Sequence, residues 1–272
     1  MTVHKDIVYV AGDNPKHTLD LYIDSQVAAP ADNRKLPLAI YIHGGAWRTG
    51  DKSEVIALCD GVLCAAGGYI AVAAISYRLS VRDDKSKMHP MHLDDVAAAV
   101  GFLLSETPYP GSDKIDRSNV FLVGHSAGAL MATMLVLQPH PTIATSLARI
   151  RGVLGVGGIY DIPRLLETNP SYADFINMAF TEDQHKTASP SYAVDSTVIS
   201  RKGMRFLLVN STTDELINSL QAADMVTKLI GAGFADVGLI VQEIGTHYGE
   251  LESKRLWRII ADFVLATQEE EK

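Results

Sequence analysis

The sequence has few cysteines, and this argues against the class of disulfide-stabilised secreted proteins. Its 272 residues contain only Cys59 and Cys64. At this spacing in a predicted helix the two side chains point in different directions, so they cannot easily bridge. We therefore expect two buried free thiols.

The sequence also lacks an apolar leader and a long hydrophobic run. The N-terminus, Met1 to Asp6, leads into a polar stretch, which is not typical of a targeting segment. The longest apolar run, residues 67–75, is too short to span a bilayer. We expect a cytoplasmic protein with no membrane partner.

Positive charge is scarce as well. The chain has 24 Lys and Arg against 32 Asp and Glu, a formal net charge of -8, which repels nucleic-acid phosphates. No paired cysteine motif and no His-Glu-x-x-His motif is present. His89 and His92 could be taken as a pair of metal ligands, but we do not predict a metal there, because Pro90 opens a helix at this point. We expect a small-molecule substrate as partner, no nucleic acid, no metal and no cofactor. A homodimer remains an open alternative.

What the sequence does contain is an alternation of short apolar runs with helical-period segments. This pattern predicts a mostly parallel sheet with helices on both faces, led by an antiparallel edge pair. The predicted strands cover residues 7–10, 18–23, 36–42, 69–76, 119–123, 150–156, 205–209 and 237–242. The predicted helices cover residues 51–66, 91–104, 127–137, 216–231 and 251–267.

The periodicity weakens between about residues 157 and 200, where Pro, Asn, Tyr and acidic residues accumulate. This composition predicts short helices inserted over one end of the sheet as a lid. The length and the ordinary globular composition, 47% hydrophobic and 21% charged, fit one domain over residues 1–272 that includes this insertion.

A Gly-x-Ser-x-Gly motif stands between a predicted strand and a predicted helix. Gly124-His125-Ser126-Ala127-Gly128 follows the strand at 119–123, which is the strand–turn–helix context of the nucleophile elbow in α/β hydrolases. The glycines permit the sharp turn that exposes a serine hydroxyl. Ser126 is therefore the candidate nucleophile; the alternative is that it only caps the helix.

A second glycine turn follows the strand at 36–42. His43-Gly44-Gly45-Ala46-Trp47 occupies the position at which an α/β hydrolase places its other oxyanion donor. We expect the backbone amides of Gly44, Gly45 and Ala127 to form the oxyanion hole. The alternative is a plain glycine turn, with His43 filling the core.

The acid and the base follow from chain order, because this fold places them after the nucleophile. His247 is the only histidine after Ser189 and follows the last predicted strand. Asp214 follows the strand at 205–209, where its carboxylate could orient His247. The alternatives are a solvated loop histidine and a helix-capping aspartate. Glu215 and Asp195 are the reserve candidates for the acid.

Together, these segments resemble the esterase and arylformamidase branch of the α/β hydrolases. Within it the chain looks most like fungal-type kynurenine formamidases, on account of Gly158-Ile159-Tyr160-Asp161, the segment 172–180 and Ser211 to Leu216. The resemblance implies hydrolysis of N-formyl-L-kynurenine to L-kynurenine and formate, a step in tryptophan breakdown. It also places the nucleophile at Ser126, its partners at Asp214 and His247, and the oxyanion donors at Gly44, Gly45 and Ala127.

Two rival functions stay open. The leading segment, residues 1–26, also looks like that of small carboxylesterases, which would use the same residues on short acyl esters. A protein that keeps this fold but only binds a ligand is the other rival, because fold does not fix function. Trp47 and Tyr160 are candidates for shaping the substrate pocket, with ordinary packing as the alternative for Trp47.

Overall fold

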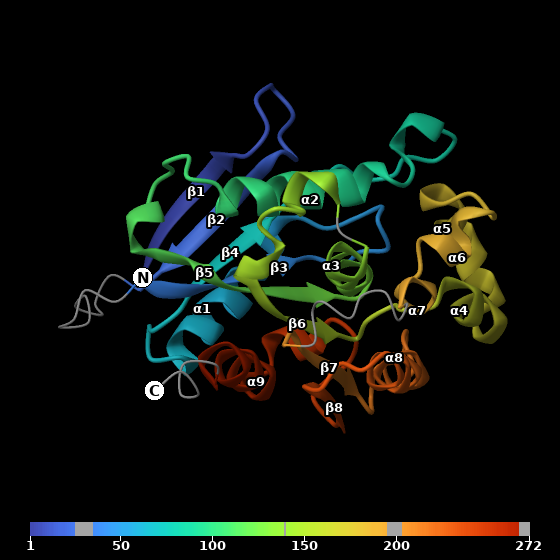
Figure 1. Cartoon of the computed structure of the whole chain (residues 1–272). Helices are drawn as coiled ribbons and strands as arrows, with labels where there is room; N and C mark the ends of the chain where they lie inside the picture. The colour runs from blue at the N-terminus through green and yellow to red at the C-terminus, as the bar shows by residue number, and fades with distance from the viewer. Residues whose placement is uncertain (25–34, 139, 195–202, 267–272) are drawn as a thin grey trace.

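The computed structural model describes residues 1–24, 35–138, 140–194 and 203–266. Eight strands form one sheet in the order β1-β2-β4-β3-β5-β6-β7-β8 (Figure 1). The strands are β1 (Thr2–Val8), β2 (Thr18–Ile23), β3 (Leu36–Ile42), β4 (Ala71–Ile75), β5 (Ile115–His125), β6 (Ile150–Val156), β7 (Arg205–Ser211) and β8 (Val237–Gln242). β2 is antiparallel to both β1 and β4, and the other neighbours are parallel. The predicted fold class and the leading antiparallel pair are confirmed.

Four strands, β2, β3, β6 and β8, have the predicted bounds, and β5 and β7 are longer than predicted. The first strand was placed wrongly at 7–10, because β1 runs over Thr2–Val8. Its register shifts between His4 and Ile7, and Asp6 has a φ of 55°, so the apolar alternation is broken there. An edge strand also needs fewer apolar residues, because it pairs on one side only.

Helices cover both faces of the sheet, as predicted. The main helices are α1 (Ile56–Ala65), α2 (Met91–Leu104), α3 (Ala127–Leu137), α8 (Leu220–Gly231) and α9 (Lys254–Leu265). Helices α1 and α9 pack on one face and α2, α3 and α8 on the other (Figure 1). Every residue of α3 is buried, so this helix lies at the centre of the larger core.

Three helices begin later than predicted. The segment predicted at 51–66 opens with a 3-10 turn, η1 (Lys52–Val55), and the one predicted at 251–267 follows another, η8 (Gly249–Glu252). The helix predicted from Leu216 begins at Leu220. Before this helix, Asp214 Oδ1 accepts the N–H groups of Leu216 and Ile217 in a separate turn.

The predicted insertion lies between β6 and β7. It contains α4 (Ile162–Thr168), η6 (Pro170–Tyr172), α5 (Ala173–Ala179), α6 (Gln184–Thr187) and α7 (Pro190–Ala193). These short helices gather at one end of the molecule, beyond α3 (Figure 1). Ion pairs from Arg48 and Arg82 to Asp174 on α5 join the insertion to two loops of the sheet.

Cys59 and Cys64 are both free, on α1. Burial was predicted for both thiols, but it holds for Cys59 alone. Cys64 is exposed because it lies on the solvent side of the helix. Over the residues that the structure describes, every helix is too short or too polar to cross a membrane.

Candidate active site

Ser126 occupies a strained turn between β5 and α3. Its backbone has φ 54° and ψ -118°, a conformation that non-glycine residues rarely adopt. Glycine is required on both sides of it. A Cβ on Gly128 would overlap Ile42 O, and one on Gly124 would overlap the backbone of Gly128. This is the geometry of a nucleophile elbow.

The Ser126 side chain does not cap α3, because it makes no capping hydrogen bond. The turn is instead fixed by the main chain, since Ser126 N donates to Val156 O at 2.9 Å and Ser126 O accepts from Ala129 N at 3.0 Å. Only 6% of the residue is exposed. The capping alternative therefore lacks support, and the hydroxyl is left free to act on a ligand.

His247 and Asp214 are hydrogen-bonded to each other. His247 Nδ1 lies 2.8 Å from Asp214 Oδ2, and the two side chains are 2% and 0% exposed. The alternative of a solvated loop histidine is therefore wrong. Asp214 Oδ1 accepts the N–H groups of Leu216 and Ile217, each at 2.9 Å, but α8 begins only at Leu220, so these bonds close a local turn and do not cap that helix.

The charge of Asp214 is secured by its neighbours. Burial alone would raise the pKa of this carboxyl group, but hydrogen bonds from His247 and two backbone N–H groups, and the charge interaction with His247, bring the pKa below its usual value. Asp214 is therefore a carboxylate at neutral pH. As acceptor it keeps a proton on His247 Nδ1, which leaves Nε2 as the nitrogen that can accept one.

Ser126 and His247 lie at the same edge of the sheet, because β5 and β8 both end there. His125, the neighbour of Ser126, has its ring centroid 4.6 Å from that of His247, and His125 Nε2 lies 2.9 Å from His247 O. No hydrogen bond joins Ser126 Oγ to His247 Nε2 in the described part of the chain. Such bonds often tighten only when substrate binds, so this contact stays a prediction.

The glycine turn after β3 packs directly against Ser126. A Cβ built on Gly44 would lie 3.0 Å from Ser126 Cβ. Gly45, Ala46 and Trp47 follow with φ of 95°, 52° and 59°, an unusual run of left-handed residues.

The predicted oxyanion donors point to no protein acceptor. Among the residues described, the N–H groups of Gly44, Gly45 and Ala127 make no hydrogen bond to the chain. Ala127 is also the first residue of α3, where the helix end carries partial positive charge. That these amides bind a developing oxyanion stays a prediction.

Tyr77 supports this turn and was not predicted from the sequence. Its hydroxyl donates to His43 O at 2.9 Å and to Gly44 O at 3.1 Å, and its ring stacks on His43 at 4.1 Å. Burial lowers the pKa of His43 to about 4, so His43 is a neutral core residue. Tyr77 stands in no recognisable motif, and only the fold brings it to the turn.

Glu215, a reserve candidate for the acid, does not contact the imidazole of His247 through a hydrogen bond in the described part of the chain. Its Oε2 accepts the backbone N–H of His247 at 3.0 Å, so it holds the loop rather than the imidazole. Asp195, the other reserve candidate, lies outside the described residues.

Trp47 and Tyr160 lie in the hydrophobic core. They line neither the cavity at the glycine turn nor the one at the insertion, which are described below. Trp47 is 1% exposed and meets Phe180 of the insertion edge to face at 4.8 Å. Tyr160 is 0% exposed and packs against Gly155 and Gly158. The structure shows that both Trp47 and Tyr160 are packed in the core, which was the alternative considered for Trp47.

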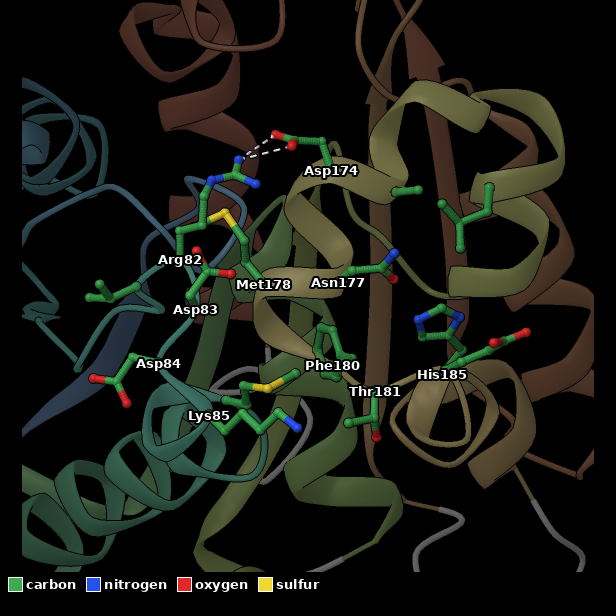
Figure 2. A pocket seen from close by; sticks show the side chains of 15 residues that line it. Arg82, Asp83, Asp84, Lys85, Asp174, Asn177, Met178, Phe180, Thr181 and His185 are labelled. Carbon is green, nitrogen blue, oxygen red and sulfur yellow. Dashed lines mark hydrogen bonds and ion pairs between the residues drawn. The ribbon is translucent and has the colours of Figure 1, made fainter.

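One cavity borders the glycine turn, and a larger one borders the insertion. The smaller, about 340 Å³, is bordered by Gly44, Gly45, His125 and the half-exposed Tyr248. The larger, about 720 Å³, lies between the loop around Arg82 and the insertion helices. Figure 2 shows its charged rim, where Arg82 and Asp174 pair, and its apolar side chains Met178 and Phe180. Neither Ser126 nor His247 lines either of these cavities.

His125, His247 and Glu250 have the donor types of a metal site, with ligand atoms within 4.8 Å of one another. Both histidines already use a ring nitrogen in hydrogen bonds to His247 O and Asp214. His92 is likewise bonded to Ser80 at 2.8 Å. We assign no metal to these groups.

The fold and the site together define an α/β hydrolase. A mostly parallel sheet covered on both faces carries a strained serine after β5, an aspartate after β7 and a histidine after β8. The BD-FAE family matches residues 19–229, and the chain belongs to this family.

Relatives and solved structures agree with this assignment. A kynurenine formamidase of Meyerozyma guilliermondii is 32% identical over 237 residues, which cover 83% of this chain and 83% of that protein. A carbohydrate esterase from gut microbiota has a TM-score of 0.77 and 18% identity, covering 100% of this chain and 97% of its own. Esterase B of Lactobacillus rhamnosis has a TM-score of 0.72 and 19% identity, covering 99% and 88%. The two structures share the fold. The chain is a hydrolase of this family.

Proposed function

We propose that the chain is a serine hydrolase that cleaves N-formyl-L-kynurenine to L-kynurenine and formate, within tryptophan breakdown. One observation carries the serine chemistry. Ser126 has a strained backbone, and its side chain makes no capping hydrogen bond. It lies at the same edge of the sheet as the buried His247, whose Nδ1 is hydrogen-bonded to Asp214 at 2.8 Å.

The mechanism is acyl transfer in two steps. Ser126 Oγ attacks the formyl carbonyl while its proton passes to His247 Nε2, and the amides of Gly44, Gly45 and Ala127 hold the oxyanion. His247 then gives that proton to the leaving arylamine, and a formyl-enzyme remains. Water, deprotonated by His247, releases formate and restores the serine. Asp214 holds the imidazolium through both steps.

Two features support a small acyl group. Ser126 is 6% exposed, and a Cβ built on Gly44 would lie 3.0 Å from Ser126 Cβ, so the glycine turn lies close to the nucleophile. The formyl carbon carries only a hydrogen and fits such a site. The relative at 32% identity is named a kynurenine formamidase, which supports the aryl amide as substrate.

A carboxylesterase that acts on short acyl esters is the second candidate, favoured by the esterase titles of the structural neighbours. Comparing kcat/KM for N-formyl-L-kynurenine with that for p-nitrophenyl acetate separates the two. We expect the formamide to be preferred by about a hundredfold or more. A preference for the ester would overturn the formamidase assignment and keep the serine chemistry.

The serine chemistry has its own test. Ser126→Ala should lower kcat about a thousandfold or more and abolish labelling by a fluorophosphonate probe. Ser118→Ala, a change on the exposed part of β5, is the matched control and should retain both. Unchanged hydrolysis by Ser126→Ala would refute the mechanism.

A further inference from the structure

Glu250 is a buried carboxyl group with no hydrogen-bond partner. It lies on η8 and is 0% exposed, and its backbone N–H donates to Thr246 O at 2.9 Å. Neither Oε1 nor Oε2 finds a donor within the described residues. Buried carboxyl groups are normally paired, so this exception requires an explanation.

The place of this carboxyl group gives the explanation. A Cβ built on Gly157 would lie 2.7 Å from Glu250 Oε1, 3.0 Å from Asp214 Oδ2 and 3.2 Å from His247 Cε1. The three groups therefore converge over one glycine. Glu250 Oε1 is also 3.6 Å from His125 Nε2. Glu250 thus stands at the edge of the imidazole next to the carboxylate that orients it.

The groups around Glu250 favour its neutral form. The titratable and charged neighbours that face it from the packed elements are Asp214, Glu215, His125, His247, Tyr41 and Tyr160. Burial first, and then the negative charges of Asp214 and Glu215, raise the pKa of Glu250 to about 9. His125 supplies no counter-charge, because burial lowers its pKa to about 3.

We propose that Glu250 is a positioning residue of the active site: its buried carboxyl group packs beside His247 and keeps the imidazole on Asp214. This inference rests on the proposed serine chemistry. When alkaline solvent removes the Glu250 proton, the resulting carboxylate repels Asp214 and competes with it for the imidazole. Ionised Glu250 therefore pulls His247 away from the geometry that serves Ser126.

The experiment is the pH profile of kcat/KM and of the fluorophosphonate labelling rate, from pH 6 to 10.5. For the wild type we expect activity to fall about fourfold between pH 7.5 and 9.5, as a group that titrates near 9 ionises. Glu250→Gln cannot ionise and should lose this alkaline fall. Glu243→Gln removes an exposed charge from the same β8–α9 connection and should keep the wild-type profile.

An alkaline fall that persists unchanged in Glu250→Gln would overturn the proposal, as would a wild type without such a fall. If Glu250→Gln does not fold, infrared titration of the wild type decides. A carboxylic acid C=O band that remains at pH 7 and vanishes near pH 9 supports the proposal, and absence of that band at pH 7 refutes it. Activity that survives Ser126→Ala would instead show that the proposed function itself has failed.

Discussion

Replacing Glu250 by glutamine should make the protein more stable, by an amount that grows with pH. Folding raises the pKa of this group from 4.5 to about 9. Below pH 4.5 the folded and unfolded chains both carry the proton. Between the two values only the folded chain keeps it, so the stability of the wild type falls as pH rises. Glutamine has no such proton and escapes this loss.

The size of the effect follows from the width of this window. Each pH unit within it changes the free energy of unfolding by about 1.4 kcal/mol, so the span from pH 5 to 8 gives a ceiling of about 4 kcal/mol. Relaxation of the loop and entry of water around an ionised group reduce this, and we expect about 2–3 kcal/mol. For a chain of this size that is a difference in Tm of roughly 5–10 °C.

The assay is urea unfolding at pH 5 and pH 8 of wild type, Glu250→Gln and the exposed control Glu243→Gln. The informative quantity is the change with pH in the stability difference between each variant and the wild type, because other titrating groups cancel in it. We expect that change for Glu250→Gln only. Equal differences at the two pH values would show that Glu250 is not protonated in the folded protein at pH 8.

Three further predictions follow from the site and the core. Asp214→Asn should lower kcat by about 10³–10⁴, since the imidazole loses the acceptor that fixes its tautomer; a loss below tenfold would contradict that role. Gly128→Ala should destabilise the chain by about 3 kcal/mol or more in urea unfolding, because its Cβ overlaps Ile42 O; wild-type stability would show that the elbow relaxes. Asp20→Asn should cost about 2–4 kcal/mol, because Asp20 pairs with the buried Lys52 at 2.6 Å; Tm measurements within 1 °C of wild type would refute this.

The architecture was largely predictable, because each buried parallel strand is a continuous apolar run that needs no partner to be recognised. The errors lie where a side chain overrides the local pattern. The apolar period of α8 starts at Leu216, but Asp214 Oδ1 accepts the N–H groups of Leu216 and Ile217 in a local turn, and the helix begins only at Leu220. Periodicity alone does not show that such a turn precedes the first helical residue.

The candidate site was predictable where the chain itself carries the motif. Ser126 and Gly44 lie in turns whose conformation requires glycine, so each turn has a recognisable glycine motif in the sequence. Tyr77 and Glu250 stand in no such motif, because their contacts are with the main chain or with residues far along the sequence. The sequence leaves the role of Trp47 open for a related reason. An aromatic residue next to an oxyanion turn looks the same in sequence whether it faces a ligand or a neighbouring helix.

The contact between Trp47 and Phe180 ties the amide turn to the insertion. Trp47 is two residues beyond Gly45, and Phe180 ends the α5 segment, so the two regions cannot be altered independently. An engineer who shortens or exchanges the insertion to admit a bulkier acyl group will also remove a packing partner of the indole beside the turn. Grafts between relatives should therefore carry both partners of this aromatic pair together.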